Sequence, residues 1–380
     1  MNQRERYLET LLFGTPDRIP LEPQSGRIST REAWHTQGLP KNILPEKIPE
    51  YGYRQAGGTL PWPEDGKGFP VYQRMVPMFE EKILEEKETT RIVQDWKGNI
   101  CEIGKQYPVE YLRNPVDFVT RRWLRCPVKT REDWEQMKMR YNPDDTTRYP
   151  DNPQILAAEL KERTWPLQLL FSGPFWQLRE WLGFEALCLM FYDDPEFVRD
   201  MIRFWTDYIS KLLQNTFSYF IPDEVHIEED MAYKGYSMIS PAMVKEFLLP
   251  TWIQWGEIIR AAGVPLYGMD SDGFIAQLIP FWIEAGFTHC DPMEVAAGND
   301  INELRNTFCR KMAFCGGIDK RAMAKGGKIL EAELERNLPV IKDGGFIPQC
   351  DHLDHGIPPD VSWPNYVHYT KLLAEATGWL

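Results

Sequence analysis

Two carboxylates that follow an apolar run are the residues best suited to chemistry in this 380-residue sequence. The run VPLYGM ends in Asp270 and Asp272, and Gly273 comes next. This pattern is typical of a buried parallel strand that delivers polar side chains to the edge of its sheet. The same Asp residues also suit the N-cap of a helix, because FIAQLIPFWIEAG follows them. A cap needs only one carboxylate, so the second one favours a functional site.

Polar side chains also end the other expected strands of the C-terminal half. They are His226, Glu228, Glu229 and Asp230; His289, Asp291 and Glu294; Asp319; and Cys350, Asp351 and His352. Each one alone can cap a helix or close a turn, and for Asp319, in GGIDKRAM, the cap is favoured. The carboxyl ends of the strands of an α/β barrel converge on one mouth, so the set predicts an active site there.

The same residues also allow a metal site. Glu229, Asp270, Asp272 and Cys350 offer oxygen and sulfur atoms of the kinds that zinc accepts, and His352 offers nitrogen. The Asp-x-Asp spacing fits two ligands beyond a strand, although such spacing is common by chance. Cys350 suits an alternative role as a small buried thiol. No compact His/Cys motif decides between these interpretations.

The elements that must hold these residues alternate regularly after Pro150. Strands are expected at 165–173, 224–230, 264–270, 287–292, 312–319 and 346–351. Amphipathic helices are expected between them, including 194–217 and 240–263, the second broken at Pro250. DRIPLEP at 17–23 and one further strand in the first half would bring the total to eight. The alternation predicts an α/β fold with a parallel sheet, and the count predicts a (β/α)8 TIM barrel.

We expect one domain over residues 1–380, because no flexible linker divides the chain. Residues 1–150, rich in Pro, Gly and aromatics, form an N-terminal segment with covering loops, and 151–380 carry the regular β/α repeats. Within the first segment the pattern predicts a helix at 2–13, hairpin strands in 97–112 and a short helix in 131–141.

Composition excludes several classes of partner and location. The formal charge of −13 argues against a nucleic-acid partner. No window holds the 18 or more uncharged apolar residues that a membrane span requires. The first residues, MNQRERYLETLLFG, lack the apolar core of a signal peptide. Seven scattered cysteines without a CxxC pair predict a reduced, cytoplasmic protein.

Several stretches, taken together, resemble the uroporphyrinogen decarboxylase superfamily. They are RERYLETLLFGTPDRIPLEP, DWKGNI, FWQLREWLGFEALCLMFYDDPEFV, EEDMAYKGYSMISPAMVKEFLLP, GMDSDGFIAQLIPFWIEAGFTHCDPMEV, CGGIDKRAM, and GGFIPQCDH followed by PPDVSWPNY. The likeness spans nearly the whole chain. The fold of that superfamily is a (β/α)8 barrel, in agreement with the strand count.

Function divides within the superfamily. The decarboxylases have an arginine-rich RQAGRYLPEYR stretch that holds the carboxylates of a porphyrinogen. This chain has RQAGGTLP at 54–61, but Gly58 replaces the second arginine and the stretch lies well after DRIPLEP. Decarboxylation of a tetrapyrrole is therefore the alternative function.

The other branch comprises cobalamin-dependent methyltransferases. In the coenzyme M enzymes, zinc is held by a His-x-Cys pair before a Gly and by a later Cys. The aligned residues here are Asp270 and Asp272 before Gly273, while Cys350 stands near the later ligand. The chain is more similar to the O-demethylases, in which carboxylates replace those ligands. A methylcobamide:thiol methyltransferase is a further alternative.

The resemblance implies a corrinoid-dependent methyltransferase that moves a methyl group from a methoxylated aromatic to the Co(I) of a corrinoid protein. A phenolate is a poor leaving group unless its oxygen is protonated or bound to a Lewis acid such as zinc. Asp230, Asp272 and His352 are expected around the ether oxygen. The residues expected to bind the substrate are Tyr236, Tyr267, Phe274 and Glu294, with core packing as the alternative for the aromatic ones. The cobalamin is expected on the partner protein, and superfamily members commonly form homodimers.

Overall fold

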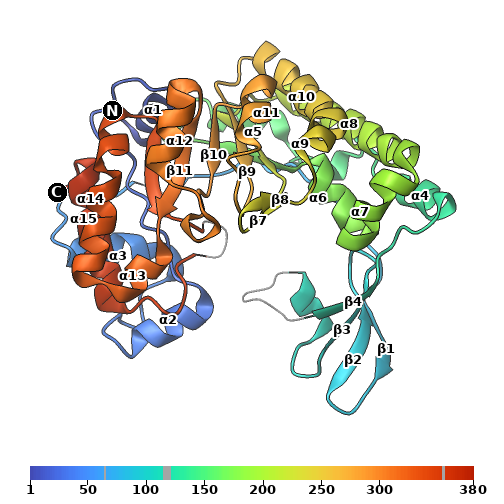
Figure 1. Cartoon of the computed structure of the whole chain (residues 1–380), viewed down its shortest axis with the longest axis horizontal. Coiled ribbons are helices and arrows are strands. Elements are labelled where there is room, and N and C mark those ends of the chain that lie inside the picture. The colour runs from blue at the N-terminus through green and yellow to red at the C-terminus, as the bar shows by residue number, and fades with distance from the viewer. Residues whose placement is uncertain (64–65, 114–120, 353–355) are drawn as a thin grey trace.

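The computed structural model describes residues 1–63, 66–113, 121–352 and 356–380. Its centre is a six-stranded parallel sheet with the order β12-β11-β10-β9-β6-β5 (Figure 1). The strands are β5 (Gln168–Ser172), β6 (Glu224–Glu228), β9 (Leu266–Asp270), β10 (His289–Asp291), β11 (Ala313–Ile318) and β12 (Phe346–Cys350). All six strands predicted in the C-terminal half are confirmed.

The predicted closed barrel is only partly present. Each strand of the sheet lies beside the next one along the chain, as in a (β/α)8 barrel. Among the described residues, however, β5 and β12 are the edges of the sheet, and no strand joins them. The strand predicted at 17–23 is wrong, because Pro20 and Pro23 lack the N–H groups that a ladder needs.

Two N-terminal segments lie beside these edges without forming strands. At one edge the side chain of Gln349 donates to Glu22, and Gly26 forms an isolated parallel bridge with Ile357. At the other edge, the Gln73 side chain accepts the N–H of Ser172 at 2.7 Å and donates to the carbonyl of Leu170 at 3.3 Å. The two N-terminal segments therefore bind the edge strands β12 and β5 through side-chain hydrogen bonds. They lie where the two remaining strands of a closed barrel would be.

The N-terminal segment contains more regular structure than covering loops. Its helices are α1 (Gln3–Leu11), α2 (Ile28–His35), α3 (Ile48–Gln55) and α4 (Arg131–Lys138); α5 (Pro153–Glu159) follows directly after the segment. A separate antiparallel sheet is formed by β1 (Lys82–Glu86), β2 (Thr90–Gln94), β3 (Ile100–Gly104) and β4 (Arg121–Arg125). The helices predicted at 2–13 and in 131–141 are confirmed. The hairpin predicted in 97–112 is confirmed only for one strand, β3, which pairs with the earlier β2, while Val109–Leu112 is a 3-10 helix. Figure 1 shows this sheet at the lower right, below α6 and α7.

Helices connect and follow the strands of the parallel sheet. They are α6 (Pro174–Leu182), α7 (Phe184–Asp193), α8 (Pro195–Phe217), α10 (Leu249–Ala261), α11 (Ile279–Ala285), α12 (Ile301–Phe308), α13 (Lys320–Lys325), α14 (Gly327–Asp343) and α15 (Trp363–Thr377). Some of them, such as α14, pack directly on β11 and β12. Short α9 (Pro241–Met243) continues into a π-helical turn at Val244–Leu248, so the irregularity expected at Pro250 lies just before it. A small hairpin, β7 (Ala232–Tyr233) and β8 (Tyr236–Ser237), follows β6. No helix of the described ranges combines the length and apolar character needed to cross a membrane.

The two faces of the parallel sheet differ in composition, because successive strand residues point to opposite sides. The face toward the helices is apolar and includes Leu169, Phe171, Val225, Ile227 and Met269 in one buried cluster. We call the opposite face the polar face; beside Leu170, Leu266, Ala313 and Ile347, the register places on it Gln168, Ser172, Glu224, His226, Glu228, Asp270, His289, Asp291, Cys315 and Gln349. Barrel interiors are usually filled by branched apolar residues, so this face is unusual.

Candidate functional site

The loops after β6, β9 and β12 bring Asp230, Asp272 and His352 together at the C-terminal edge of the sheet. Asp230 Oδ1 accepts the backbone N–H of Asp272 at 3.0 Å, and His352 Nδ1 lies 3.6 Å from Asp272 Oδ1. The Asp272 side chain is 40% exposed and the His352 side chain only 13%. A dissolved molecule can therefore reach the Asp272 carboxylate beside a largely covered imidazole.

Two left-handed backbone positions shape these loops. Asp230 has φ +40°, a region that Asp tolerates better than most residues. Gly273 has φ +89°, and a Cβ there would lie 2.4 Å from a backbone atom of Ala232. Only glycine fits this close approach, so the Asp272–Gly273 turn depends on it.

Arg179 of α6 holds Asp230 from the helix side. Its Nη1 donates to the Asp230 carbonyl at 2.8 Å, and its Nη2 lies 3.8 Å from Asp230 Oδ2. The guanidinium also lies over the Trp176 ring, 4.3 Å from its centroid. Sequence reasoning missed Arg179, because a single arginine inside an amphipathic helix carries no pattern that points to a site.

A second group of charges supports the same turn. Glu294 Oε2 accepts the N–H of Gly273 at 3.2 Å, and its Oε1 lies 3.2 Å from Lys320 Nζ. Asp351 accepts the N–H groups of Val295 and Lys320, and its Oδ1 lies 3.8 Å from Lys320 Nζ. Burial raises the pKa of Asp351 to about 6, although Lys320 opposes this shift. Lys320 was also missed, since it follows the cap residue Asp319 as an ordinary helix residue.

The four predicted metal ligands are not gathered around one point. Glu229 is buried; its carboxylate accepts the N–H of Trp176 at 3.0 Å and Trp252 Nε1–H at 2.9 Å, and burial raises its pKa to about 8. Cys350 lies in the apolar cluster that contains Tyr366 and Tyr369, and burial raises the pKa of its thiol. One zinc ion bound by these two together with Asp270 and Asp272 would require both to leave their surroundings. The set does not fit zinc.

The predicted substrate-binding aromatics are in different environments. Tyr267 is part of the core: its ring stacks on Phe287 at 3.7 Å, and its hydroxyl donates to the Trp252 carbonyl at 3.2 Å. Tyr236 lies on the β7–β8 hairpin and is 62% exposed. The N–H of Phe274 donates to the carbonyl of Tyr233 in the same hairpin at 3.0 Å, which brings Phe274 next to it.

The prediction that Asp319 is a helix cap is confirmed. Its side chain accepts the N–H of Arg321 at 2.8 Å at the start of α13 and forms an ion pair with the Arg321 guanidinium. This strand-end carboxylate has a structural role.

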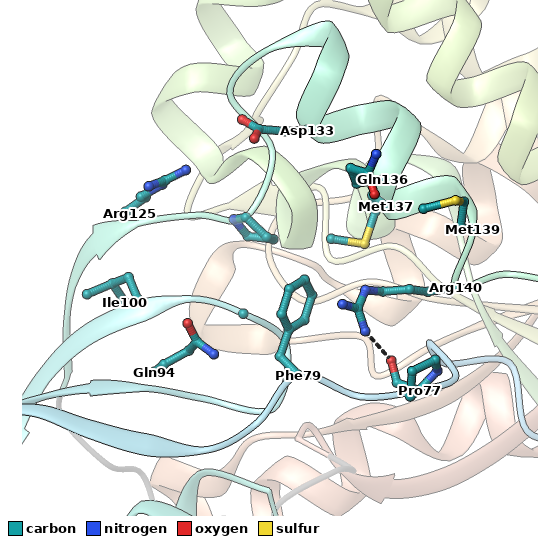
Figure 2. Close-up of a pocket in the computed structure, with 12 residues that line it drawn as sticks. Pro77, Phe79, Gln94, Ile100, Arg125, Asp133, Gln136, Met137, Met139 and Arg140 are labelled. Carbon is teal, nitrogen blue, oxygen red and sulfur yellow. Dashed lines mark hydrogen bonds between the residues drawn. The ribbon is translucent and has the colours of Figure 1, made fainter.

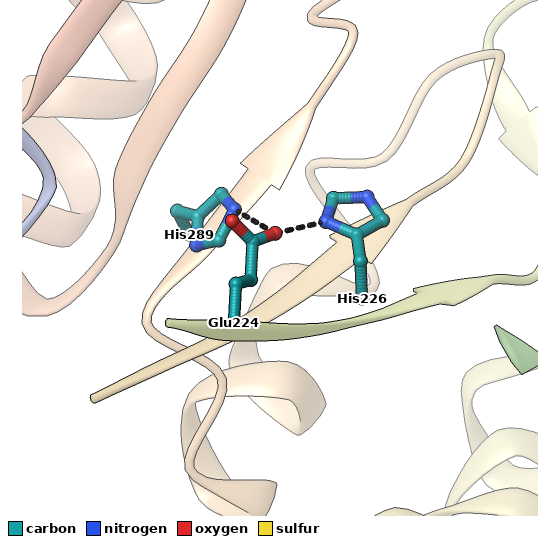
Figure 3. Close-up of side chains that lie close together, drawn as sticks. All are labelled: Glu224, His226 and His289. Carbon is teal, nitrogen blue, oxygen red and sulfur yellow. Dashed lines mark hydrogen bonds and ion pairs between the residues drawn. The ribbon is translucent and has the colours of Figure 1, made fainter. Parts of the chain in front are cut away.

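A buried cluster on the polar face joins Glu224 to two imidazoles (Figure 3). Glu224 Oε1 lies 2.6 Å from His226 Nδ1 and 3.0 Å from His289 Nε2. Burial alone would raise the pKa of Glu224, but His289 and His226 outweigh it and hold that pKa well below its usual range. Sequence reasoning placed both histidines among the polar ends of their strands, but His226 lies in the middle of β6 and His289 begins β10. It missed Glu224, which begins β6 and so lies outside the set of strand ends.

Two cavities lie away from the strand-end carboxylates. One, of about 460 Å³, lies between α4 and the antiparallel sheet (Figure 2). Its wall includes Phe79, over which the Arg140 guanidinium lies at 3.8 Å. The other, of about 540 Å³, is lined by Glu22, Trp62, Trp165 and Gln168 at the open side of the parallel sheet. Neither is lined by the three residues predicted to be catalytic.

Comparisons with known proteins agree with the architecture. A methyltransferase from Methanosarcina mazei has the same fold, with a TM-score of 0.58, 12% identity and 99% of each chain covered. A B12-independent methionine synthase from Shewanella sp. W3-18-1 is less similar, with a TM-score of 0.40, 10% identity, and 59% of this chain and 65% of that one covered. No curated protein matches the sequence significantly. The sequence model of the family described as Uroporphyrinogen decarboxylase (URO-D) matches residues 115–375. Because that match spans more than half of the chain, this protein belongs to the uroporphyrinogen decarboxylase family.

Proposed function

We propose that this protein is a corrinoid-dependent methyltransferase that takes the methyl group of a methoxylated aromatic and passes it to the Co(I) of a corrinoid protein. The observation that carries the proposal is the meeting of Asp230, Asp272 and His352 at the C-terminal edge of the sheet. Chemistry in α/β folds collects at this edge. The likeness in fold to a methyltransferase supports the class of reaction by analogy only.

The reaction requires the enzyme to stabilise the negative charge that develops on the ether oxygen. The bond from the methyl carbon to oxygen breaks and its electron pair stays on oxygen. A Co(I) corrinoid held by the partner would supply the electron pair for the new bond to carbon. The phenolate that leaves needs a proton. His352 is the proposed donor, because its ring lies at the C-terminal edge of the sheet with Nδ1 3.6 Å from the Asp272 carboxylate.

The other residues position this pair. Asp230 fixes the Asp272 backbone through its N–H, and Arg179 in turn anchors Asp230. Glu294 holds the next residue, Gly273, and Lys320 holds Glu294. Removing one of these supports would shift the Asp272 carboxylate relative to His352, and a misplacement of about 1 Å is enough to slow a reaction that depends on geometry.

The substrate ring would lie against the exposed hairpin after β6. Tyr236 offers an exposed aromatic face there, and Phe274 lies beside the same hairpin. Aromatic faces favour offset stacking on a flat ring. Glu294 would accept a hydrogen bond from a hydroxyl on the ring. No zinc is part of the proposal, because Glu229 and Cys350 are engaged elsewhere.

The test is a methyl-transfer assay with a reduced corrinoid and a panel of methoxylated aromatics, followed by the loss of Co(I) absorption. His352→Gln and Asp272→Asn should slow transfer from the best substrate by about 10²-fold or more, as expected for removal of a general acid. Asp319→Asn is the matched control, because it changes another strand-end carboxylate while Asn still caps α13. An unchanged rate in His352→Gln would contradict the assignment of the donor.

Tetrapyrrole decarboxylation is tested in a second arm with a porphyrinogen. The residue that would bind its carboxylates is Arg54, whose Nη1 donates to the carbonyls of Gly58 at 3.1 Å and Leu60 at 2.8 Å. Its Nη2 donates to Glu50. Both terminal nitrogens of Arg54 therefore already donate hydrogen bonds within the protein, and these are the groups that a carboxylate ligand would bind. Release of CO₂ without any methyl transfer would nevertheless replace the proposal, as would transfer from a methylated corrinoid to a thiol.

A further inference from the structure

We propose that Glu224, His226 and His289 bind one divalent transition-metal ion of the zinc class on the polar face of the sheet. Figure 3 shows the Glu224 carboxylate between the two imidazole rings. All three side chains are buried, and one ligand atom from each lies within 4.8 Å of the others. Two histidines and one carboxylate form a ligand set that zinc and iron(II) both use. This site is separate from the strand-end carboxylates, so it does not depend on the proposed function.

The spacing of the ligand atoms needs only a small adjustment. Glu224 Oε1 lies 2.6 Å from His226 Nδ1 and 3.0 Å from His289 Nε2. Ligands about 2.0–2.1 Å from a tetrahedral zinc ion lie roughly 3.4 Å from one another. Side-chain rotations that open these two gaps by less than about 1 Å, and that set the two nitrogens, now within 4.8 Å of each other, at the same separation, would therefore admit the ion.

Each imidazole already has a second partner that fixes its orientation. His226 Nε2 lies 3.4 Å from Asp291 Oδ1, and His289 Nδ1 lies 3.1 Å from the Thr288 hydroxyl. Ligating histidines almost always use their other ring nitrogen in this way. The nitrogens that remain, Nδ1 of His226 and Nε2 of His289, are the two that face Glu224.

The carboxylate is held as firmly as the rings. The hydroxyl of Tyr7 donates to Glu224 Oε2 at 2.6 Å, and Gln168 Nε2 donates to Oε1 at 2.7 Å. Such supporting hydrogen bonds are typical of carboxylates that bind metals. Tyr7 comes from α1, so the site connects the N-terminal helix with the sheet.

A glycine clears the space at the ligand atoms. Gly268 of β9 pairs with His226 on one side and His289 on the other. A Cβ at this position would lie 2.2 Å from His226 Nδ1 and 2.6 Å from His289 Nε2. These are the two nitrogens assigned as ligands. Gly268, which lies between the two histidines in the sheet, must therefore lack a side chain.

Two further features suit a cation. Asp291 is a buried acid that contacts His226, and Glu22, which is only partly buried, contacts Gln349 on the same face of the sheet. Buried charges of one sign are stabilised by pairing or by a metal. The cavity of about 540 Å³ is lined by Glu22 and by Gln168, which itself contacts Glu224. The cluster therefore adjoins a cavity through which an ion can approach.

The experiment titrates Zn²⁺ into the chelator-treated protein by calorimetry. The wild type should bind one equivalent, and His289→Gln should weaken that binding by more than about tenfold. His352→Gln is the matched control: it removes the histidine at the strand-end site and should leave Zn²⁺ affinity unchanged. The absence of binding to the wild type, or equal binding to His289→Gln, would overturn the proposal and leave the cluster as a buried ion-pair network.

A second measurement uses the wild type alone and so does not depend on how well a variant folds. Crystals soaked with Zn²⁺ should show anomalous density between Glu224, His226 and His289. Density at Asp270 and Asp272 in place of the cluster would contradict the assignment.

Discussion

Single buried carboxylates of this protein are satisfied by different partners. Glu224 is held by two imidazoles, Glu229 by N–H groups of α6 and of Trp252, and Asp351 by two backbone N–H groups and Lys320. The kind of partner decides how each group responds to pH. A carboxylate whose partners do not fully offset its burial is protonated at a higher pH than in the unfolded chain.

Asp351 provides a test of this response. Its pKa rises from 3.8 to about 6 on folding, so the folded protein binds more protons than the unfolded chain between these values. The free energy of unfolding of the wild type, measured relative to Asp351→Asn, should therefore fall by roughly 1–3 kcal/mol as pH rises from about 4 to 6.5. Urea denaturation of the wild type and of Asp351→Asn across this pH range measures this difference in the free energy of unfolding. If the free energies of unfolding of the two proteins changed in parallel with pH, the raised pKa of Asp351 would be contradicted.

Cys350 tests the difference between a buried thiol and a ligand. Because its side chain packs with Tyr366 and Tyr369, Cys350→Ala should lower the free energy of unfolding by about 1–2 kcal/mol. The rate of methyl transfer per folded molecule should stay unchanged. Thermal denaturation and the corrinoid assay measure the two effects. If Cys350→Ala lost activity without losing stability, Cys350 would take part in the reaction and would not be only a buried core residue.

At the scale of single residues, the sequence predicted well which side chains lie close together. It predicted less well which face of the sheet each side chain points to. Asp230, Asp272 and His352 follow strands, and residues just after neighbouring parallel strands must lie near one another. Tyr267 and Cys350 lie inside strands that are buried on both faces. Such strands are apolar without clear alternation, so the sequence does not tell a residue of the helix face from one of the polar face.

Among the elements, α8 shows how a local signal sets a helix boundary. The Asp194 side chain accepts the N–H of Phe197 at 3.1 Å, and Pro195 takes the first helical position. Both features were readable from the sequence, because they are preferences of a helix start. Asp194 also forms an exposed ion pair with Arg131 at 2.7 Å.

Two substitutions separate these roles of Asp194. Asp194→Ala should cost about 1 kcal/mol in the free energy of unfolding, because the first turn of α8 loses its acceptor. Asp194→Asn keeps the acceptor and loses only the exposed ion pair, which contributes little. It should therefore stay within about 0.5 kcal/mol of the wild type in urea denaturation. Equal losses in both variants would assign the effect to the ion pair.

The elements that the sequence did not predict have physical reasons of their own. β1 is exposed along its whole length and β4 nearly so, so neither shows the alternation of apolar and polar residues that marks a half-buried strand. DRIPLEP was expected as a strand, but its prolines prevent a ladder, and side-chain contacts hold it instead. Strand patterns report burial, and these segments are either exposed or broken by proline.

At the scale of the whole molecule, one sheet carries two separate groups of residues for which we propose functions. The strand-end residues Asp230, Asp272 and His352 lie at its C-terminal edge, whereas Glu224 and His289 begin their strands on the polar face. The open side of the sheet adjoins the second group through a cavity. This division predicts that zinc binding and methyl transfer respond to different substitutions.

The measurement that tests the central claim most directly follows a labelled methyl group. A methoxylated aromatic that carries isotopic label in its methyl group is incubated with this protein and a Co(I) corrinoid protein. The account predicts that label appears on cobalt in equal amount to the phenol released, and that Asp272→Asn suppresses both. Phenol without label on cobalt, or no phenol from any methoxylated aromatic while a porphyrinogen loses CO₂, would contradict it.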